Sequence, residues 1–229
     1  MNWLYLIINV ATIFFPIVLS FDKKVYFKRQ WGATILAGAI VSIPFLIWDY
    51  FFTKNGFWGF TGDYLMGWKL GGLPIEEIFF FITIPFACIF IYECVRAYFP
   101  KKEFMNLNFL VYAGLFALLT YIIWGNKGGW YSISVAIATL ITLGYVGRNR
   151  KKYPHLPLAF LISLIPFLVV NGVLTGAVTE APVVWYNENE FSSVRLFTIP
   201  LEDILYSWNL IALNCLLFDR FRERGAKND

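Results

Sequence analysis

Long apolar segments recur along the whole chain, and they constrain the fold more than any other feature. A helix needs about 20 mainly apolar residues to cross the hydrocarbon core of a bilayer. Backbone polar groups in lipid must be satisfied within the segment, and the alternation typical of a β-barrel is missing. The sequence therefore predicts an all-α polytopic membrane helical bundle of about seven transmembrane helices. The expected spans are residues 3–20, 33–52, 74–99, 107–124, 130–146, 156–178 and 200–218.

Composition supports a membrane protein over a soluble domain. The chain is 59% hydrophobic and 15% charged, whereas soluble domains average about 45–50% apolar and about 25% charged residues. The first apolar segment has neither a basic leader nor a small-residue cleavage site, so we expect a retained span and not a signal peptide. Cys88, Cys94 and Cys215 form no C-x-x-C pair, which indicates neither a disulfide framework nor a zinc site.

Basic residues predict the orientation of the chain. Of 19 Lys and Arg residues, 15 lie on or beside one set of connections. The other side holds only Lys54, Lys69, Lys127 and Arg195. Lys and Arg are retained on the cytoplasmic side, so we expect an integral protein of a bacterial-type cytoplasmic membrane, with its N-terminus outside and its C-terminus in the cytoplasm. The basic loops are expected to set this topology and to bind no nucleic acid.

A short acidic motif occurs twice. Leu73-Pro74-Ile75-Glu76-Glu77-Ile78 is echoed 126 residues later by Ile199-Pro200-Leu201-Glu202-Asp203-Ile204. Residues 43–46 resemble residues 165–168 at an offset of 122, which predicts a four-residue insertion near residues 184–190. Beyond the motifs, Glu93 aligns with Asp219 and Arg96 with Arg222. The sequence therefore indicates an internal duplication.

The duplication predicts a domain plan of three, one and three helices. Residues 1–106 and 128–229 would be the two repeats, and residues 107–127 would be a connecting transmembrane helix. Three crossings would invert the second repeat, and one extra span restores the parallel orientation. Such repeats are related by a pseudo-two-fold axis along the membrane normal. The two acidic motifs would then face each other at one depth.

The motif places carboxyl groups at the start of an apolar helix. Pro74 and Pro200 suit the first helical position, and the helix dipole favours negative charge in the turn that follows. One such copy would be an ordinary acidic helix start. Two copies favour function, because ionisable residues within membrane spans are rare and mark functional pathways. Crowded carboxyls cannot all ionise, which leaves an acid beside a base.

Further candidates flank the motifs. Asp49 and Asn171 lie near the outer end of the second helix of each repeat. Asp49 could join the acidic cluster or pair with Lys54 at the interface. Nearby aromatic residues either form an interfacial belt or line a substrate site, where their faces could stabilise a cation. The candidate substrate-binding residues are Trp48, Asp49, Phe80, Asn171 and Tyr206.

Several site types are not expected. The chain has no G-x-G-x-x-G fingerprint and no P-loop. Its single histidine, His155, lies in a basic connection away from the acids, and the D-x-x-x-D magnesium motif of prenyl-transferring enzymes is missing. We therefore expect no cofactor and no metal site.

The twin P-x-E-[ED] motifs, Pro74-Ile75-Glu76-Glu77 and Pro200-Leu201-Glu202-Asp203, on this helix plan resemble the membrane lycopene cyclases of the heterodimeric type, in their fused two-half form. The resemblance covers nearly the whole chain. It implies an isomerase (an intramolecular lyase) of carotenoid biosynthesis. That enzyme would form ionone rings, with the β ring expected, at the ends of lycopene without net redox change.

The resemblance also implies roles for the four motif acids. Glu76 and Glu202 would include the proton donor, and Glu77 and Asp203 would act as base or as orienting partners. Lys69 and Arg195 would tune these acids or anchor the loops at the interface. The expected partners are lycopene taken from the bilayer and membrane lipid, and a homo-oligomer is compatible with this reading.

Two alternatives stay open. A related carotenoid-modifying enzyme, either a hydratase or a cyclase of C50 carotenoids, would use the same acid but quench the cation differently. A proton-coupled transporter built from parallel repeats would need polar residues along its whole path. Residues 78–90 are almost wholly apolar, which disfavours the transporter.

Overall fold

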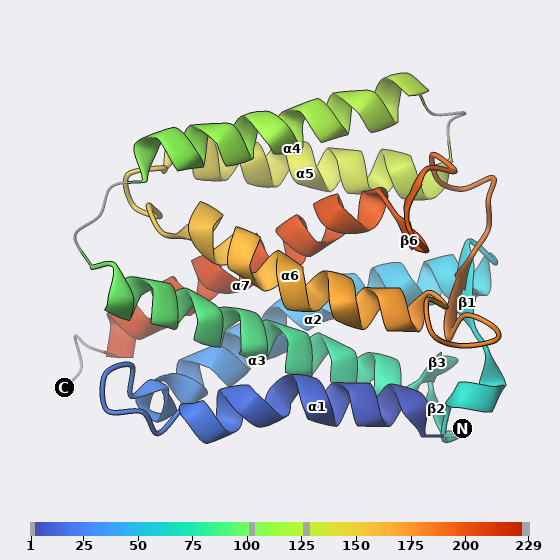
Figure 1. Cartoon of the computed structure of the whole chain (residues 1–229), viewed down its shortest axis with the longest axis horizontal. Coiled ribbons are helices and arrows are strands. Elements are labelled where there is room, and N and C mark those ends of the chain that lie inside the picture. The colour runs from blue at the N-terminus through green and yellow to red at the C-terminus, as the bar shows by residue number, and fades with distance from the viewer. Residues whose placement is uncertain (1–2, 101–103, 126–128, 226–229) are drawn as a thin grey trace.

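The computed structural model describes residues 3–100, 104–125 and 129–225. These residues form a bundle of long helices, as Figure 1 shows, so the predicted all-α bundle is confirmed. Short 3-10 helices lie at η1 (Phe27–Gln30) and η2 (Gly62–Tyr64). The long helices are α1 (Leu4–Leu19), α2 (Trp31–Lys54), α3 (Ile75–Tyr98), α4 (Met105–Gly125), α5 (Trp130–Arg148), α6 (Leu156–Leu174) and α7 (Glu202–Gly225).

Most helix ends lie within a few residues of their predicted positions, but two helices depart from the expectation. The helix α6 ends at Leu174 and not near residue 178, because Gly176 takes a φ of 100°, a left-handed conformation that ends helices. The other departure is α7, which continues to Gly225, beyond the predicted end at residue 218.

Within the described ranges, five helical segments are long and apolar enough to cross a membrane. They include α2 to α6, whereas α1 is apolar but has only 16 residues. The protein is therefore a helical membrane protein in which the two remaining helices, α1 and α7, are less typical spans.

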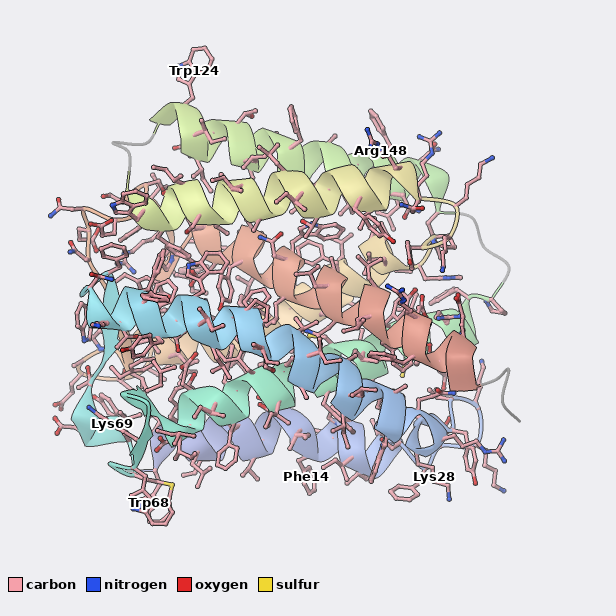
Figure 2. The ribbon with its side chains drawn as sticks, turned by 180° about the vertical axis from the view of Figure 1, so that it is seen from behind. Phe14, Lys28, Trp68, Lys69, Trp124 and Arg148 are labelled. Carbon is pink, nitrogen blue, oxygen red and sulfur yellow. The ribbon has the colours of Figure 1, made fainter. Side chains whose placement is uncertain are left out.

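The surface of the bundle is apolar and polar side chains are buried within it. Phe14 on α1 and Trp124 on α4 point away from the bundle in Figure 2, and Trp124 is 93% exposed. In contrast, Thr139, Ser207 and Asn209 are fully buried. A large exposed apolar surface is rare on soluble monomers. This distribution is the one that a bilayer requires.

The helices of the two repeats pack in equivalent ways. Helix α1 lies against α3, and α5 lies against α7. Further contacts cross between the halves, because α2 packs against α7 and α3 packs against both α6 and α7. The helices α2, α3, α6 and α7 therefore form the centre of the bundle. Helix α4 packs against α5 and α6, opposite α1 in Figure 1. The repeat boundaries at residues 106 and 128 stay a prediction.

Short strands join the halves at the end of the bundle where both motifs lie, which we call the motif end. Strand β1 (Trp58–Phe60) pairs antiparallel with β4 (Val184–Tyr186), so that Gly59 faces Trp185. Residues 58–60 of β1 and residues 184–186 of β4 lie 126 positions apart in the sequence. Exchanging each residue for its equivalent at this offset gives the same set of pairs. The strand pair is therefore itself two-fold symmetric about its central residues.

Two equivalent hairpins precede the motifs. Strand β2 (Lys69–Leu70) pairs with β3 (Leu73–Pro74), and β5 (Arg195–Leu196) pairs with β6 (Ile199–Pro200). Because β1 and β4 already align at the offset of 126, the extra residues lie between α6 and β4. The predicted insertion near residues 184–190 was therefore placed too late in the chain.

Reciprocal ion pairs join the halves at the opposite end. Arg96 on α3 pairs with Asp219 on α7, and Nη1 of Arg222 lies 3.2 Å from Oε2 of Glu93. The two pairs are exchanged by the same shift of 126 residues. Figure 2 shows Lys28 and Arg148 at this basic end and Lys69 at the motif end. The separation agrees with the charge pattern, although Lys127 lies outside the described residues and the orientation across the membrane stays a prediction.

Candidate functional site

A cavity of about 50 Å³ lies between the two halves at the motif end. Both repeats line it, and the β1–β4 strand pair contributes to its wall; we call it the shared cavity. The first half supplies Tyr5, Asp49, Trp58, Phe60, Glu77 and Phe80. The second half supplies Phe167, Asn171, Leu174, Val184, Asp203, Tyr131, Tyr186 and Tyr206.

The second acid of each motif reaches the shared cavity. Glu77 lies in the first turn of α3, and Asp203 in the first turn of α7. Successive residues of a helix point about 100° apart, so both acids of one motif cannot face the same space. The fold therefore selects one carboxyl from each repeat.

The first acid of each motif binds the loop that precedes it. Oε1 of Glu76 accepts the backbone N–H of Met66 at 2.6 Å, and Oε1 of Glu202 accepts that of Ser192 at 2.7 Å. Glu202 also accepts the hydroxyl of Ser132 at 2.6 Å. Glu76 and Glu202 are fully buried, and neither lines the shared cavity. This geometry favours a loop-anchoring role for the two residues that the sequence suggested as proton donors.

Asp203 is surrounded by hydrogen-bond donors. The hydroxyl of Tyr131 donates to Oδ1. Oδ2 accepts from Nδ2 of Asn171 at 2.6 Å and from the hydroxyl of Tyr186 at 3.0 Å. Burial raises the pKa of Tyr186 well above its usual value, so this phenol stays protonated and able to donate. Donors of this kind favour the ionised form of the carboxyl.

Glu77 has a sparser environment. Its Oε2 accepts the hydroxyl of Tyr5 at 2.5 Å. Tyr5 and Tyr131 lie 126 residues apart, so each repeat places a tyrosine from its first helix on its cavity carboxyl. The amide that supports Asp203 has no counterpart here, because the position equivalent to Asn171 is Asp49.

Asp49 is buried with one oxygen unpaired. Its Oδ1 accepts Nε1 of Trp58 at 2.5 Å, and Oγ1 of Thr53 lies 3.5 Å away. Its Oδ2 has no hydrogen-bond partner among the described residues, although Asp49 is only 2% exposed. A buried polar atom without a partner costs about 1–3 kcal/mol. Such an atom at a cavity wall indicates a functional constraint.

Aromatic rings form much of the remaining wall. Phe80 and Tyr206 line the shared cavity, whereas Trp48 packs behind Tyr206 with ring centroids 5.3 Å apart. The sequence suggested four motif acids and five substrate-binding residues. Six of these nine line the cavity, while Glu76, Glu202 and Trp48 do not. The lining candidates are Asp49, Glu77, Phe80, Asn171, Asp203 and Tyr206.

The two basic candidates lie on the hairpins. Lys69 is exposed, and Nη2 of Arg195 lies 2.6 Å from Oε1 of Glu188. Arg195 also donates to the carbonyl of Thr198 at 2.7 Å. These contacts fit loop anchoring better than tuning of the motif acids.

Four polar cavity residues were missed by sequence reasoning. Tyr5 and Tyr131 could have been found, because they share the 126-residue spacing of the motifs. Trp58 and Tyr186 gave no such signal, since their position depends on strand pairing between distant loops. The shared cavity thus combines aromatic walls with three buried carboxyl groups, away from bulk water.

The fold and the shared cavity define a duplicated helical membrane protein with a buried carboxyl site made by both halves. The chain belongs to the lycopene cyclase family, whose model ("Lycopene cyclase") matches residues 2–95 and 126–221. The family assignment suggested by the twin motifs is thereby confirmed.

A distant curated relative agrees with this assignment. It is the bifunctional lycopene cyclase/phytoene synthase of Podospora anserina, which is 29% identical over 75 residues. The match covers 33% of this chain and 12% of that protein, so the chain spans only a small part of its relative. No solved structure matches the chain.

Proposed function

We propose that this protein closes ionone rings at the ends of linear lycopene, with the β ring as the expected product. The observation that carries the proposal is the shared cavity, where Asp49, Glu77 and Asp203 meet among aromatic walls. Ring closure of a polyene needs a proton donor, a proton acceptor and protection from water. Membership of the lycopene cyclase family supports the choice of substrate.

The reaction proceeds through carbocations. A carboxylic acid protonates the terminal double bond and leaves a tertiary cation. The next double bond attacks this cation, which closes a six-membered ring and moves the positive charge onto the ring. A carboxylate then removes a ring proton, and the position of that proton decides between a β and an ε ring. The net change is an isomerisation.

The cavity walls suit the cationic stages. Phe80 and Tyr206 line the cavity, and the face of an aromatic ring attracts a positive charge by about 0.5–2 kcal/mol per contact. Neither ring is a good nucleophile, so the cation survives until it is deprotonated. Burial of the carboxyls limits quenching by water, which would give a hydroxylated product.

The cavity must enlarge to admit an end group. A benzene ring fills an engineered cavity of about 150 Å³, whereas the shared cavity holds about 50 Å³. Entry of the substrate therefore requires side chains of the wall to move. We expect the polyene to enter from the bilayer, because the outer surface of the bundle is apolar.

Expression in cells that accumulate lycopene tests the function. Pigment chromatography should show loss of lycopene and gain of β-carotene, with a monocyclic intermediate at early times. ε-Carotene would correct the ring type alone, and a hydroxylated product would indicate a hydratase. Unchanged lycopene in cells that contain the folded protein would refute the proposal.

A further inference from the structure

The two halves of the shared cavity carry unequal polar groups. At the equivalent positions in the second helix of each repeat, the first half has Asp49 and the second half has Asn171. An amide can donate a hydrogen bond to a neighbouring carboxylate, whereas an ionised carboxylate cannot. The duplication has therefore diverged at the residue beside each motif carboxyl.

The donors are distributed unevenly over the three cavity carboxyls. Asp203 accepts hydrogen bonds from Tyr131, Asn171 and Tyr186, so both of its oxygens are satisfied. Trp58 and Thr53 both donate to Oδ1 of Asp49, and its Oδ2 is unpaired among the described residues. Hydrogen bonds to the charged form favour ionisation. Glu77 accepts one hydrogen bond, from Tyr5. Among the three cavity carboxyls, Oδ2 of Asp49 is the described oxygen that is buried without a partner, so a proton on this oxygen relieves the unfavourable burial of its charge.

We propose that the shared cavity is one composite active site with divided roles, in which Asp49 is the proton donor and Asp203 is the proton acceptor. This assignment rests on the proposed function and deepens it. Glu77 lines the same cavity, and like-charge repulsion between Glu77 and Asp49 disfavours ionisation of both carboxyls together. The chain then cyclises one end group at a time, and a bicyclic product needs two binding events.

The proton balance closes within the site. The O–H bond of Asp49 breaks as a C–H bond forms at the less substituted carbon of the terminal double bond, which leaves the tertiary cation on its other carbon. After the carbon–carbon bond of the ring has formed, a ring C–H bond breaks. Its electron pair becomes the ring double bond, and its proton passes to Asp203. Return of that proton to Asp49 restores the starting state, so the cycle consumes no oxidant, reductant or co-reactant.

Deuterium labelling of lycopene by the full-length protein in D₂O separates the two roles. Asp49→Asn should lower cyclisation by at least about 100-fold, the usual contribution of a general acid, and should leave the recovered lycopene unlabelled. Asp203→Asn should also block cyclisation. In that variant Asp49 still delivers deuterium reversibly, so the recovered lycopene should carry label at its end groups.

Controls keep the result interpretable. Asp49→Glu retains a carboxylic acid, so it should label lycopene where Asp49→Asn does not. The thermal transition of each variant in detergent reports whether that variant folds. Asp22→Asn, in a turn at the basic end, should behave as the parent. Cyclisation or labelling at parental rates by Asp49→Asn would overturn the role of Asp49. Label found with Asp49→Asn but not with Asp203→Asn would reverse the assignment. Failure of the parent itself to consume lycopene would instead refute the proposed function.

Discussion

Nδ2 of Asn171 lies 2.6 Å from Oδ2 of Asp203 and donates a hydrogen bond to it. The equivalent residue of the first repeat, Asp49, offers Glu77 no such amide. The difference between an amide and an acid at one repeated position therefore breaks the symmetry of a duplicated site. This asymmetry is the basis for assigning different tasks to the halves.

Replacing Asn171 by leucine should destabilise the ionised form of Asp203, which is the form that accepts a proton. Asn171→Leu keeps the approximate shape but removes one of three donors to Asp203. A hydrogen bond to a charged group contributes about 1.5–3 kcal/mol, so cyclisation should fall about 10- to 100-fold. The rate of product formation per folded protein checks this. Asn108→Leu removes an amide on α4 that binds the carbonyl of Pro154, and it should leave the rate unchanged.

Replacing Glu202 by glutamine should affect stability more than chemistry. The amide oxygen of glutamine can replace Oε1 of Glu202, which accepts from Ser132 and Ser192, but the bonds then lose the charge of the acceptor. The amide nitrogen replaces Oε2 and cannot accept the hydroxyl of Ser192. The loss should be about 1–3 kcal/mol of unfolding free energy, seen as a lower thermal transition. Activity per folded molecule should stay close to that of the parent.

The competing interpretation has a different outcome. If Glu202 were the proton donor, Glu202→Gln would lower activity by about 100-fold or more without a matching loss of stability. The matched control is Glu223→Gln, because Glu223 pairs with Lys152 at the surface, where both side chains are about half exposed. This control should change neither quantity appreciably.

A methyl group at Gly59 should disturb the strand pair that covers the shared cavity. A Cβ at this position would lie 2.4 Å from a ring carbon of Trp185, so either the indole ring or one of the two strands must shift. Overpacking of this kind costs about 1–3 kcal/mol. We expect Gly59→Ala to lower both the thermal transition and the cyclisation rate. Gly62→Ala, three residues away with nothing within 4 Å, should do neither.

The ion pair between Arg96 and Asp219 should couple the halves at the basic end. Asp219 is buried, so Arg96→Gln leaves a carboxyl short of its cation and should destabilise the fold. A double-mutant cycle with Asp219→Asn should give a coupling energy of about 0.5–3 kcal/mol. The same cycle on Lys152 and Glu223 should give roughly 0–1 kcal/mol. Equal coupling energies for the two pairs would contradict the structural role.

Local signals account for what the sequence predicted well. The helix ends follow from apolar length, proline and glycine, so most spans lie close to their expected limits. The repeat is also a local pattern, because Glu76 and Glu202 keep one spacing with Arg96 and Arg222. The sequence identified the acids and the end of the bundle where they meet.

Which acid of each motif points into the shared cavity could not be predicted from the sequence, because it depends on contacts with loops. Glu76 and Glu202 turn away from the shared cavity because backbone N–H groups of Met66 and Ser192 bind them. The positions of Trp58 and Tyr186 follow from pairing between strands of different repeats. Neither the hydrophobic pattern nor the motif carries that information.

The strand pair also bears on how such a protein can be assembled. Each half supplies one of its two strands, so either half alone would present an unpaired edge and an open cavity wall. Because α4 tethers the halves, they meet at an effective concentration set by the linker and not by expression level. A single polypeptide thereby fixes the stoichiometry of acid and base at one to one.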